Sequence, residues 1–443
     1  MAAPNTDFSQ GSVWKNIVRM SIPITLAQLI NILYNIVDRM YIGHIPGAGA
    51  LALTGLGLCL PVISIVMAFA RLSGMGGGPL CSIERGKGDL QEAERIMGNS
   101  FTLLMIFAVV LTFLGEVFLR PILMAFGASN DTIGYAMDYG RIYLAGNVFV
   151  LISLGMNNFI NAQGFARTGM VTTLVGAVLN IVLDPIFIFV LDWGVKGAAT
   201  ATVISQAVSA LWVMQFLTGK RAQLRLRWEN LKLNAQRTGR ILTLGFSGFV
   251  MAFTNSAVQV VCNSVLSSYG GDLYVGVMTV LSSIREVVSM PVQGLTGAAE
   301  PVLGFNYGAR KMQRVRQGIR FISVCALAYS LLVWGIIRVI PGPLIRIFNN
   351  EDHLVQTAVP ALGIYFATFF MMALQFAGQS TFVSLGKSKQ AVFFSIFRKV
   401  IIVLPLILIL PRWFGLGTTG IFMAEPISNL IGGVACYVTM LIT

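Results

Sequence analysis

An asparagine and an aspartate lie four residues apart in the otherwise apolar stretch 176–189, GAVLNIVLDPIFIF. A spacing of four places Asn180 and Asp184 on one face of a helix, about one turn apart. An ionisable side chain inside a membrane span is costly and by default marks a functional site. Pro185 follows and removes one backbone donor, so a carbonyl one turn earlier could also face an ion. The alternative interpretation is a polar pair that packs at a kinked helix.

The composition of the chain indicates a membrane protein. Hydrophobic residues make up 56% of the 443 residues, charged residues make up only 11%, and the mean hydropathy is +0.77. A soluble domain carries about 25% charged residues, so this chain lacks the polar surface of one. Dividing the chain into spans of about 20 apolar residues predicts twelve of them. They are 17–42, 50–76, 97–119, 133–159, 166–191, 195–218, 240–268, 273–300, 318–340, 355–383, 390–411 and 417–441.

The lysines and arginines between these spans indicate an orientation. If both termini are cytoplasmic, the cytoplasmic segments hold twenty of the 31 basic residues and the opposite side holds five, as the positive-inside rule requires. This asymmetry accounts for the net charge of +13. The basic runs at 220–232 and 309–320 lie between spans and lack the aromatic interleaving of a stacking platform, so we expect contacts with membrane lipids and no nucleic-acid partner.

The second half of the chain repeats the first. Five identities recur at an offset of 222 residues: Pro79 and Pro301, Gly86 and Gly308, Pro121 and Pro343, Phe126 and Phe348, and Gly164 and Gly386. An even number of spans in each half makes the halves parallel repeats. We therefore predict an all-α polytopic membrane protein with two pseudo-symmetric six-helix bundles. The expected N-lobe is 1–219, the basic cytoplasmic linker is 220–239, and the C-lobe is 240–443.

Polar residues of three predicted spans reach a similar depth in the membrane. From the cytoplasm, Asp38 lies about 21 residues into the first span and Asp184 about 19 into the fifth, while Thr202 lies about seven residues into the sixth from outside. At this depth they can meet, with Asn180 about 6 Å deeper. Two carboxylates, an amide carbonyl and a hydroxyl offer hard oxygen ligands to a small cation. Because two carboxylates in one pocket repel, we expect one to hold a proton, so the site suits H⁺ or Na⁺.

Other polar side chains are expected to surround this site or to line a cavity. In the first half, some of these residues precede Asp38 by about a turn, and others share a face of the fourth span. One more follows Thr202 by four residues. The alternative for each is a structural hydrogen-bond network between helices. They are Tyr34, Asn35, Tyr139, Tyr143, Asn147, Gln206, Asn255, Gln259 and Glu286.

The second half departs from the first in its charges. The repeat partner of Asp38 is Val260, so the duplicate has lost that carboxylate. Charged side chains inside a bundle should pair with one another, and such pairs can be purely architectural. The sequence leaves open the roles of these charged residues, which are Arg285, Glu286, Arg398, Lys399 and Glu425.

Motifs for enzymatic chemistry are missing from the sequence. The glycines at 74–78, GMGGG, lack the lysine and the serine or threonine of a phosphate-binding loop, so no nucleotide is expected. These glycines fit a close helix approach or a hinge better. The two histidines, His44 and His353, lie in predicted external loops, and no HExxH or GxSxG is present. We expect neither an enzyme nor a cofactor.

Four stretches resemble multidrug and toxic compound extrusion (MATE) transporters, in particular the MepA-like group. They are SIPITLAQLINILYNIVDRMYIGH, MAFARLSGMGGGPLCSIERGKGD, LNIVLDPIFIF with GVKGAATATVISQ, and GAAEPVLGFNYGARK. The resemblance implies two six-helix bundles around a central cavity that opens alternately to either side. It also implies that Asp38, Asn180, Asp184 and Thr202 match the cation site of the N-lobe, whereas the C-lobe coupling acids of some relatives are absent here.

These features together predict a secondary active antiporter. It would export cationic, amphipathic drugs in exchange for H⁺ or Na⁺ as a functional monomer in the cell membrane. A lipid-linked precursor flippase of the same superfamily is the alternative, although extra spans and a strongly cationic cavity would be expected for it. A channel would differ by conducting ions without stoichiometric exchange.

Overall fold

The computed structural model describes residues 7–413 and 415–443, and every regular element in these ranges is a helix. The all-α class predicted from the sequence is therefore confirmed. The chain divides into two compact units. The first comprises the residues up to Ser9 together with Ile22–Gly245, and the second comprises Gln10–Ser21 together with Phe246–Thr443.

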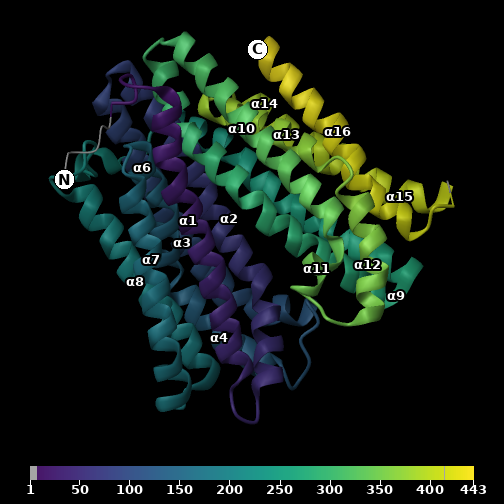
Figure 1. The fold of residues 1–443 in the computed structure, drawn as a ribbon. Coiled ribbons are helices and arrows are strands. Elements are labelled where there is room, and N and C mark those ends of the chain that lie inside the picture. The colour runs from purple at the N-terminus through teal and green to yellow at the C-terminus, as the bar shows by residue number, and fades with distance from the viewer. Residues whose placement is uncertain (1–6, 414) are drawn as a thin grey trace. The chain divides into compact units, whose positions relative to one another are not determined.

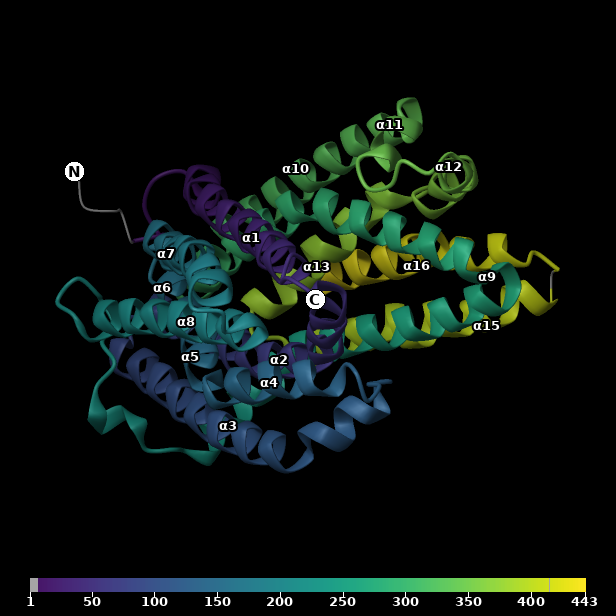
Figure 2. The same ribbon diagram turned by 90° about the horizontal axis from the view of Figure 1, so that it is seen from below.

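The helices of the first half include two short π-helical segments, η1 and η2, and one 3-10 turn, η3. In chain order they are α1 (Val13–Gly43), α2 (Gly49–Lys87), α3 (Leu90–Ala125), α4 (Ile133–Ala145), α5 (Asn147–Leu151), η1 (Ile152–Met156), α6 (Asn157–Ala162), α7 (Ala166–Pro185), η2 (Ile186–Val190), α8 (Gly194–Thr218) and η3 (Trp228–Leu231). Helices α7 and α8 lie side by side in both ribbon views (Figures 1 and 2).

The helices of the second half also contain a 3-10 turn, η4, and a π-helical segment, η5. They are α9 (Ala235–Gly308), α10 (Met312–Val339), α11 (Pro341–Arg346), α12 (Asp352–Tyr365), η4 (Phe369–Met371), α13 (Met372–Ser384), α14 (Ser388–Ile396), η5 (Phe397–Val403), α15 (Leu404–Trp413) and α16 (Thr418–Ile442).

Within the described ranges, nine helices are long and apolar enough to cross a membrane. Two further apolar segments are pairs of helices bent by 59° and 47°. Helix α9 is 74 residues long and joins two helices at Gly271, whose φ of 67° suits glycine. Counting each bent pair once and α9 twice gives the twelve predicted spans.

The predicted spans 133–159 and 355–383 each contain one of the two bends, which hydropathy alone does not reveal. The first bend lies at Gly146, where a Cβ atom would come within 2.4 Å of the Val203 side chain of α8. The second bend lies near Thr368, where two side chains donate hydrogen bonds to backbone oxygens. Trp334 Nε1 donates to Ala367 O (3.1 Å), and Thr368 Oγ1 donates to Pro426 O (2.6 Å). Such side-chain donors make broken helices tolerable inside a membrane.

The glycines at 74–78 lie buried within α2 and allow backbones to approach closely. A Cβ atom on Gly76 would lie 2.1 Å from the carbonyl oxygen of Ile241 at the start of α9, and one on Gly77 would lie 2.4 Å from Ser100 Oγ of α3. Only glycine permits such contacts. The predicted role of these glycines in close helix approach is confirmed.

The predicted linker follows the surface of the first unit and is held there by hydrogen bonds. Leu224 N donates to Gln163 Oε1 (2.9 Å), and Asn234 N donates to Asn99 Oδ1 (2.9 Å). Arg237 forms a two-pronged ion pair with Glu92. These contacts hold the basic segment against α3 and the end of α6.

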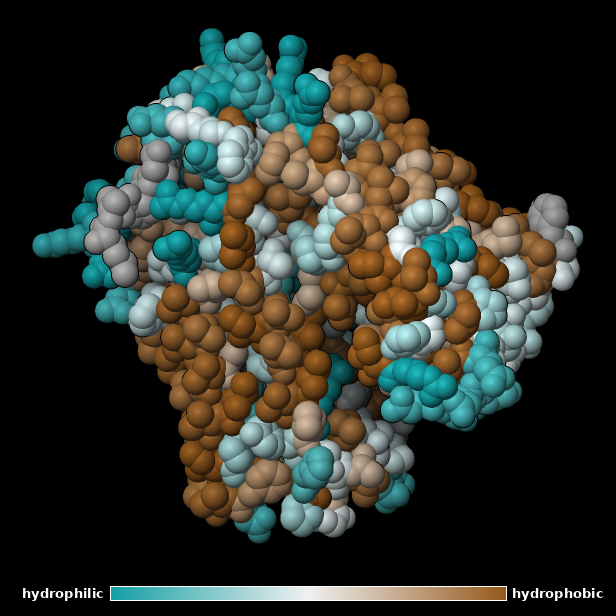
Figure 3. All heavy atoms as spheres, viewed as in Figure 1, coloured by the Kyte–Doolittle hydropathy of each residue, from teal (hydrophilic) through white to brown (hydrophobic). Residues whose placement is uncertain are grey.

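Large apolar side chains are exposed along the flanks of the first unit. Val109, Phe113 and Leu211 are each at least 66% exposed. On the face shown in Figure 3, hydrophobic residues cover the middle of this unit's helices, and hydrophilic residues gather toward its upper end. An apolar flank of this kind is expected where lipid replaces water as the solvent.

Candidate functional site

The polar pair on α7 is buried and internally bonded. Asp184 is fully buried and Asn180 is 2% exposed. Asn180 Nδ2 donates to Asp184 Oδ1 (3.1 Å), as the spacing of four predicts, and also reaches Thr202 Oγ1 (3.4 Å) on α8. Pro185 ends α7, and the chain continues as the π-helical segment η2. The proline therefore disturbs the helix directly beside Asp184.

A second carboxyl group reaches this pair from α1. Asp38 is 7% exposed, and its carboxyl group lies within hydrogen-bonding reach of that of Asp184. Two ionised carboxylates are acceptors only, so neither can donate to the other. Their contact therefore requires a proton on one of them or a cation between them.

Tyrosines enclose the two carboxyl groups. Tyr139 is buried, lies beside Thr202, and stacks on Tyr143 with ring centroids 6.2 Å apart. Tyr34 approaches from α1, close to both Asp38 and Asp184. The structure thus brings the four predicted site residues of the first half together and adds an aromatic wall to them.

Three acceptor oxygens in this cluster have no donor among the described residues. They are Asp38 Oδ1, Asn180 Oδ1 and Asp184 Oδ2, each with almost no exposed area. Buried acceptors are normally satisfied by a donor. These unpaired acceptors belong to side chains of α1 and α7. A proton or a small cation bound beside them would supply the missing partner.

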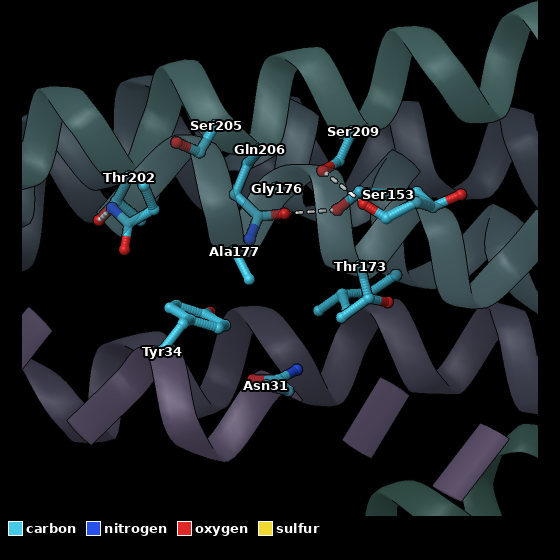
Figure 4. A pocket seen from close by; sticks show the side chains of 13 residues that line it. Asn31, Tyr34, Ser153, Thr173, Gly176, Ala177, Thr202, Ser205, Gln206 and Ser209 are labelled. Carbon is cyan, nitrogen blue, oxygen red and sulfur yellow. Dashed lines mark hydrogen bonds between the residues drawn. The ribbon is translucent and has the colours of Figure 1, made fainter. Parts of the chain in front are cut away.

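A narrow pocket continues from this cluster between α1, α7 and α8 (Figure 4). Asn31 and Tyr34 of α1 lie opposite Thr202, Ser205 and the other labelled residues of α8. The cavity volume is about 30 Å³. Such a volume holds water or a small ion, whereas drug-sized ligands need roughly 300–1,000 Å³.

Sequence reasoning missed several hydroxyl and amide residues of this pocket. Ser153 Oγ donates to Gln206 Oε1 (2.6 Å), and Ser209 Oγ donates to Thr172 O (3.2 Å). A signal was present, since the polar residues of α8 recur every three or four positions, as one helix face requires. The polar lining residues that were not predicted are Asn31, Ser153, Thr172, Thr173, Ser205 and Ser209.

A sequence model described as MatE matches residues 23–186 and 248–409, which together make up most of the chain. The chain belongs to the MatE family. The resemblance that its motifs indicated is confirmed.

Relatives and solved structures agree with this assignment. The multidrug export protein MepA of Staphylococcus haemolyticus (strain JCSC1435) is 24% identical over 426 residues, covering 96% of this chain and 92% of the relative. A structure described as MATE in complex with MaD3S has a TM-score of 0.92 at 24% identity, covering 100% of this chain and 98% of the other. An outward-facing multidrug resistance MATE family transporter of the MOP superfamily has a TM-score of 0.91 at 23% identity, with the same coverage. This MatE-family chain is thus a multi-pass membrane transporter with the MATE fold.

Two predicted residues of the first half do not join the carboxyl cluster. Asn35 Nδ2 donates to Asn31 O (2.7 Å) on its own helix. Asn147 follows the bend at Gly146 and donates to Ala108 O of α3 (3.4 Å). The bend interrupts the continuous face that the spacing of Tyr139, Tyr143 and Asn147 predicts.

The neutral residues predicted in the second half make local contacts. Gln259 Nε2 donates to Asn263 Oδ1 (2.9 Å), and Ser282 Oγ reaches Gln259 Oε1 (3.4 Å). Asn255 and Glu286 are exposed on their unit. Their proposed place around a cavity stays a prediction.

The predicted pairing of charges in the second half is confirmed for four of the five residues. Glu425 of α16 contacts all three basic side chains, Arg285, Arg398 and Lys399. Glu286 forms no ion pair with the described residues and lies outside this cluster.

Proposed function

We propose that this MatE-family protein exports amphipathic organic cations in exchange for protons or sodium ions, with Asp38 and Asp184 binding the coupling ion. The observation that carries the proposal is the set of buried acceptor oxygens on Asp38, Asn180 and Asp184 that lack a donor among the described residues. A buried acceptor without a partner destabilises its surroundings. Binding of a positive ion removes that penalty.

The donor set fits either coupling ion. A proton on Asp38 or Asp184 would turn one carboxylate into a donor for the other, since the two lie within hydrogen-bonding reach. A sodium ion would use the two carboxylates, the amide oxygen of Asn180 and the hydroxyl of Thr202 as hard oxygen ligands. A bound proton and a bound sodium ion would each relieve the repulsion between the two carboxylates, so the site would hold one ion at a time.

Exchange follows if ion and drug favour different conformations. Ion binding at the carboxyl cluster would stabilise an outward-facing state of low drug affinity, and drug binding would favour release of the ion. The two effects must be equal because both ligands act on one conformational equilibrium. The narrow pocket beside the cluster is too small for a drug, so in this proposal it widens when a drug enters.

The decisive experiment measures ethidium transport in proteoliposomes, with a pH gradient and a sodium gradient imposed separately. We expect one gradient to drive export by the wild type and Asp184→Asn to abolish it, because the amide keeps the shape but loses the charge. Asp38→Asn should have the same effect. Asp138→Asn is the matched control, because that half-exposed aspartate pairs with Lys196 and is not part of the carboxyl cluster. Normal gradient-driven export by both cluster variants would refute the proposed coupling site.

A further inference from the structure

Three basic side chains surround a single carboxylate in the second unit. Arg285 Nη1 lies 2.9 Å from Glu425 Oε1, and Lys399 Nζ lies 3.1 Å from Glu425 Oε2. Arg398 Nη2 also donates to Glu425 Oε1. Three positive charges and one negative charge leave the cluster with a formal charge of +2.

This excess charge is buried. The side chains of Arg398, Lys399 and Glu425 are 10%, 8% and 7% exposed. Among the described residues, no second carboxylate pairs with any of the three basic side chains. Removing charge from water costs several kcal/mol per ion unless an opposite charge compensates it. One glutamate compensates only one of the three cations.

Donor groups also remain open within the cluster. Arg398 donates from Nε to Ser428 Oγ (3.3 Å) and from Nη2 to Glu425. Its Nη1 has no acceptor among the described residues. Arg285 uses only Nη1, and its guanidinium lies 5.7 Å from the ring centroid of Tyr365. Its side chain is 25% exposed, so this arginine is the least buried member of the cluster.

The local backbone brings adjacent basic residues to the same target. Arg398 and Lys399 lie in the π-helical segment η5, a rare conformation that is frequent at functional sites. The stem of Arg398 packs on Gly432 of α16, where a Cβ atom would be 3.2 Å from Arg398 Cγ. The segment 194–205, GVKGAATATVIS, is echoed at 417–428, GTTGIFMAEPIS, at an offset of 223, which pairs Thr202 with Glu425. The second unit therefore carries excess positive charge where the first carries open acceptors.

We propose that Arg285, Arg398 and Lys399 form a binding site for a small monovalent anion, a carboxylate or a halide, beside Glu425. The anion would use the open arginine donors and reduce the excess charge. The competing explanation is a purely architectural ion cluster, which needs no ligand. This anion site does not depend on the transport function proposed above.

The test is the thermal unfolding midpoint of the purified full-length protein, titrated with potassium chloride or potassium acetate. Potassium gluconate, whose anion is much larger than chloride or acetate, keeps the ionic strength constant. A ligand that binds the folded state raises the midpoint in a saturable way. We expect such a rise for the wild type, and a response to chloride, to acetate or to both would name the ligand class.

Two substitutions should shift the half-saturating anion concentration in opposite directions. Lys399→Met lowers the formal charge of the cluster to +1 and should weaken binding on the order of tenfold. Glu425→Gln raises it to +3 and should tighten binding by a similar factor. An architectural cluster would be destabilised by both changes without any dependence on the anion.

Matched controls keep the test decisive. Arg346→Gln removes a basic charge from an exposed ion pair with Asp352 in the same unit, so its anion response should equal that of the wild type. If Glu425→Gln does not fold, Lys399→Arg, which keeps the charge, should retain binding that Lys399→Met loses. Absence of a saturable rise in the wild type, or equal responses in Lys399→Met and the wild type, would overturn the proposal.

Discussion

At the scale of single residues, the orientation of the Asn180 amide is central to the proposed ion site. Its nitrogen bonds Asp184 and Thr202, so its oxygen stays unpaired among the described residues, as do one oxygen of Asp38 and one of Asp184. The hydroxyl of Thr202 also lies beside Tyr139. Thr202 therefore lies between the amide of α7 and the aromatic wall of α4.

Replacing Thr202 separates the hydroxyl from the shape of the side chain. Thr202→Val keeps the volume and removes the oxygen, which leaves the Asn180 amide without one partner. We expect the apparent affinity for the coupling ion to fall about tenfold, whereas Thr202→Ser should stay near the wild type. The measurement is the ion concentration that gives half-maximal ethidium export. Equal values for Thr202→Val and Thr202→Ser would exclude a role for the hydroxyl.

At the scale of elements, α2 is shaped by glycine contacts with its neighbours. Gly76 packs against the carbonyl oxygen of Ile241, and a Cβ atom on Gly245 would lie only 1.8 Å from the carbonyl oxygen of Leu72. The backbones of α2 and α9 therefore touch at two points. A backbone atom cannot move aside as a side chain can. This crossing fixes the start of α9 against the first unit.

Alanine substitutions along α2 test this crossing. Gly76→Ala places a methyl group against the Ile241 carbonyl, so we expect a loss of stability of about 1–3 kcal/mol or failure to fold. Gly57→Ala lies in the same helix with nothing within 4 Å of its Cβ, so it should stabilise by about 0.5–1 kcal/mol. Thermal unfolding in detergent measures both. A similar loss in the two variants would show that helix propensity, and not the crossing, sets the effect.

At the scale of the whole molecule, the distribution of charge carries two kinds of information. The basic residues between spans predict which side of the membrane each loop occupies. The charges inside the units separate by sign, with open acceptors around Asp38 and Asp184 in the first unit and excess cations around Glu425 in the second. The two halves of the repeat have therefore kept one fold and diverged in chemistry.

The predicted orientation can be tested by cysteine labelling in a variant without native cysteines. Asn130→Cys lies in the exposed α3–α4 connection, predicted to be external, and Ala235→Cys lies at the exposed start of α9, predicted to be cytoplasmic. We expect a membrane-impermeant maleimide to label only Asn130→Cys in intact cells and both variants after permeabilisation. Labelling of Ala235→Cys in intact cells would reverse the assigned orientation.

The sequence by itself determined the membrane class, the twelve spans, the repeat and the residues of the carboxyl cluster. Hydropathy reports spans because lipid requires long apolar helices, and the depth of Asp38, Asp184 and Thr202 follows from the fixed rise of a helix. The spacing of Asn180 and Asp184 was enough to place them on one face.

Only the tertiary structure decided which groups meet across helices. The bends near Gly146 and Thr368, the orphaned oxygen of Asn180 and the contact of three cations with Glu425 all depend on neighbours distant in the sequence. Composition and spacing describe one helix at a time. Close packing between helices selects rotamers, bends and partners, and no local pattern encodes that choice.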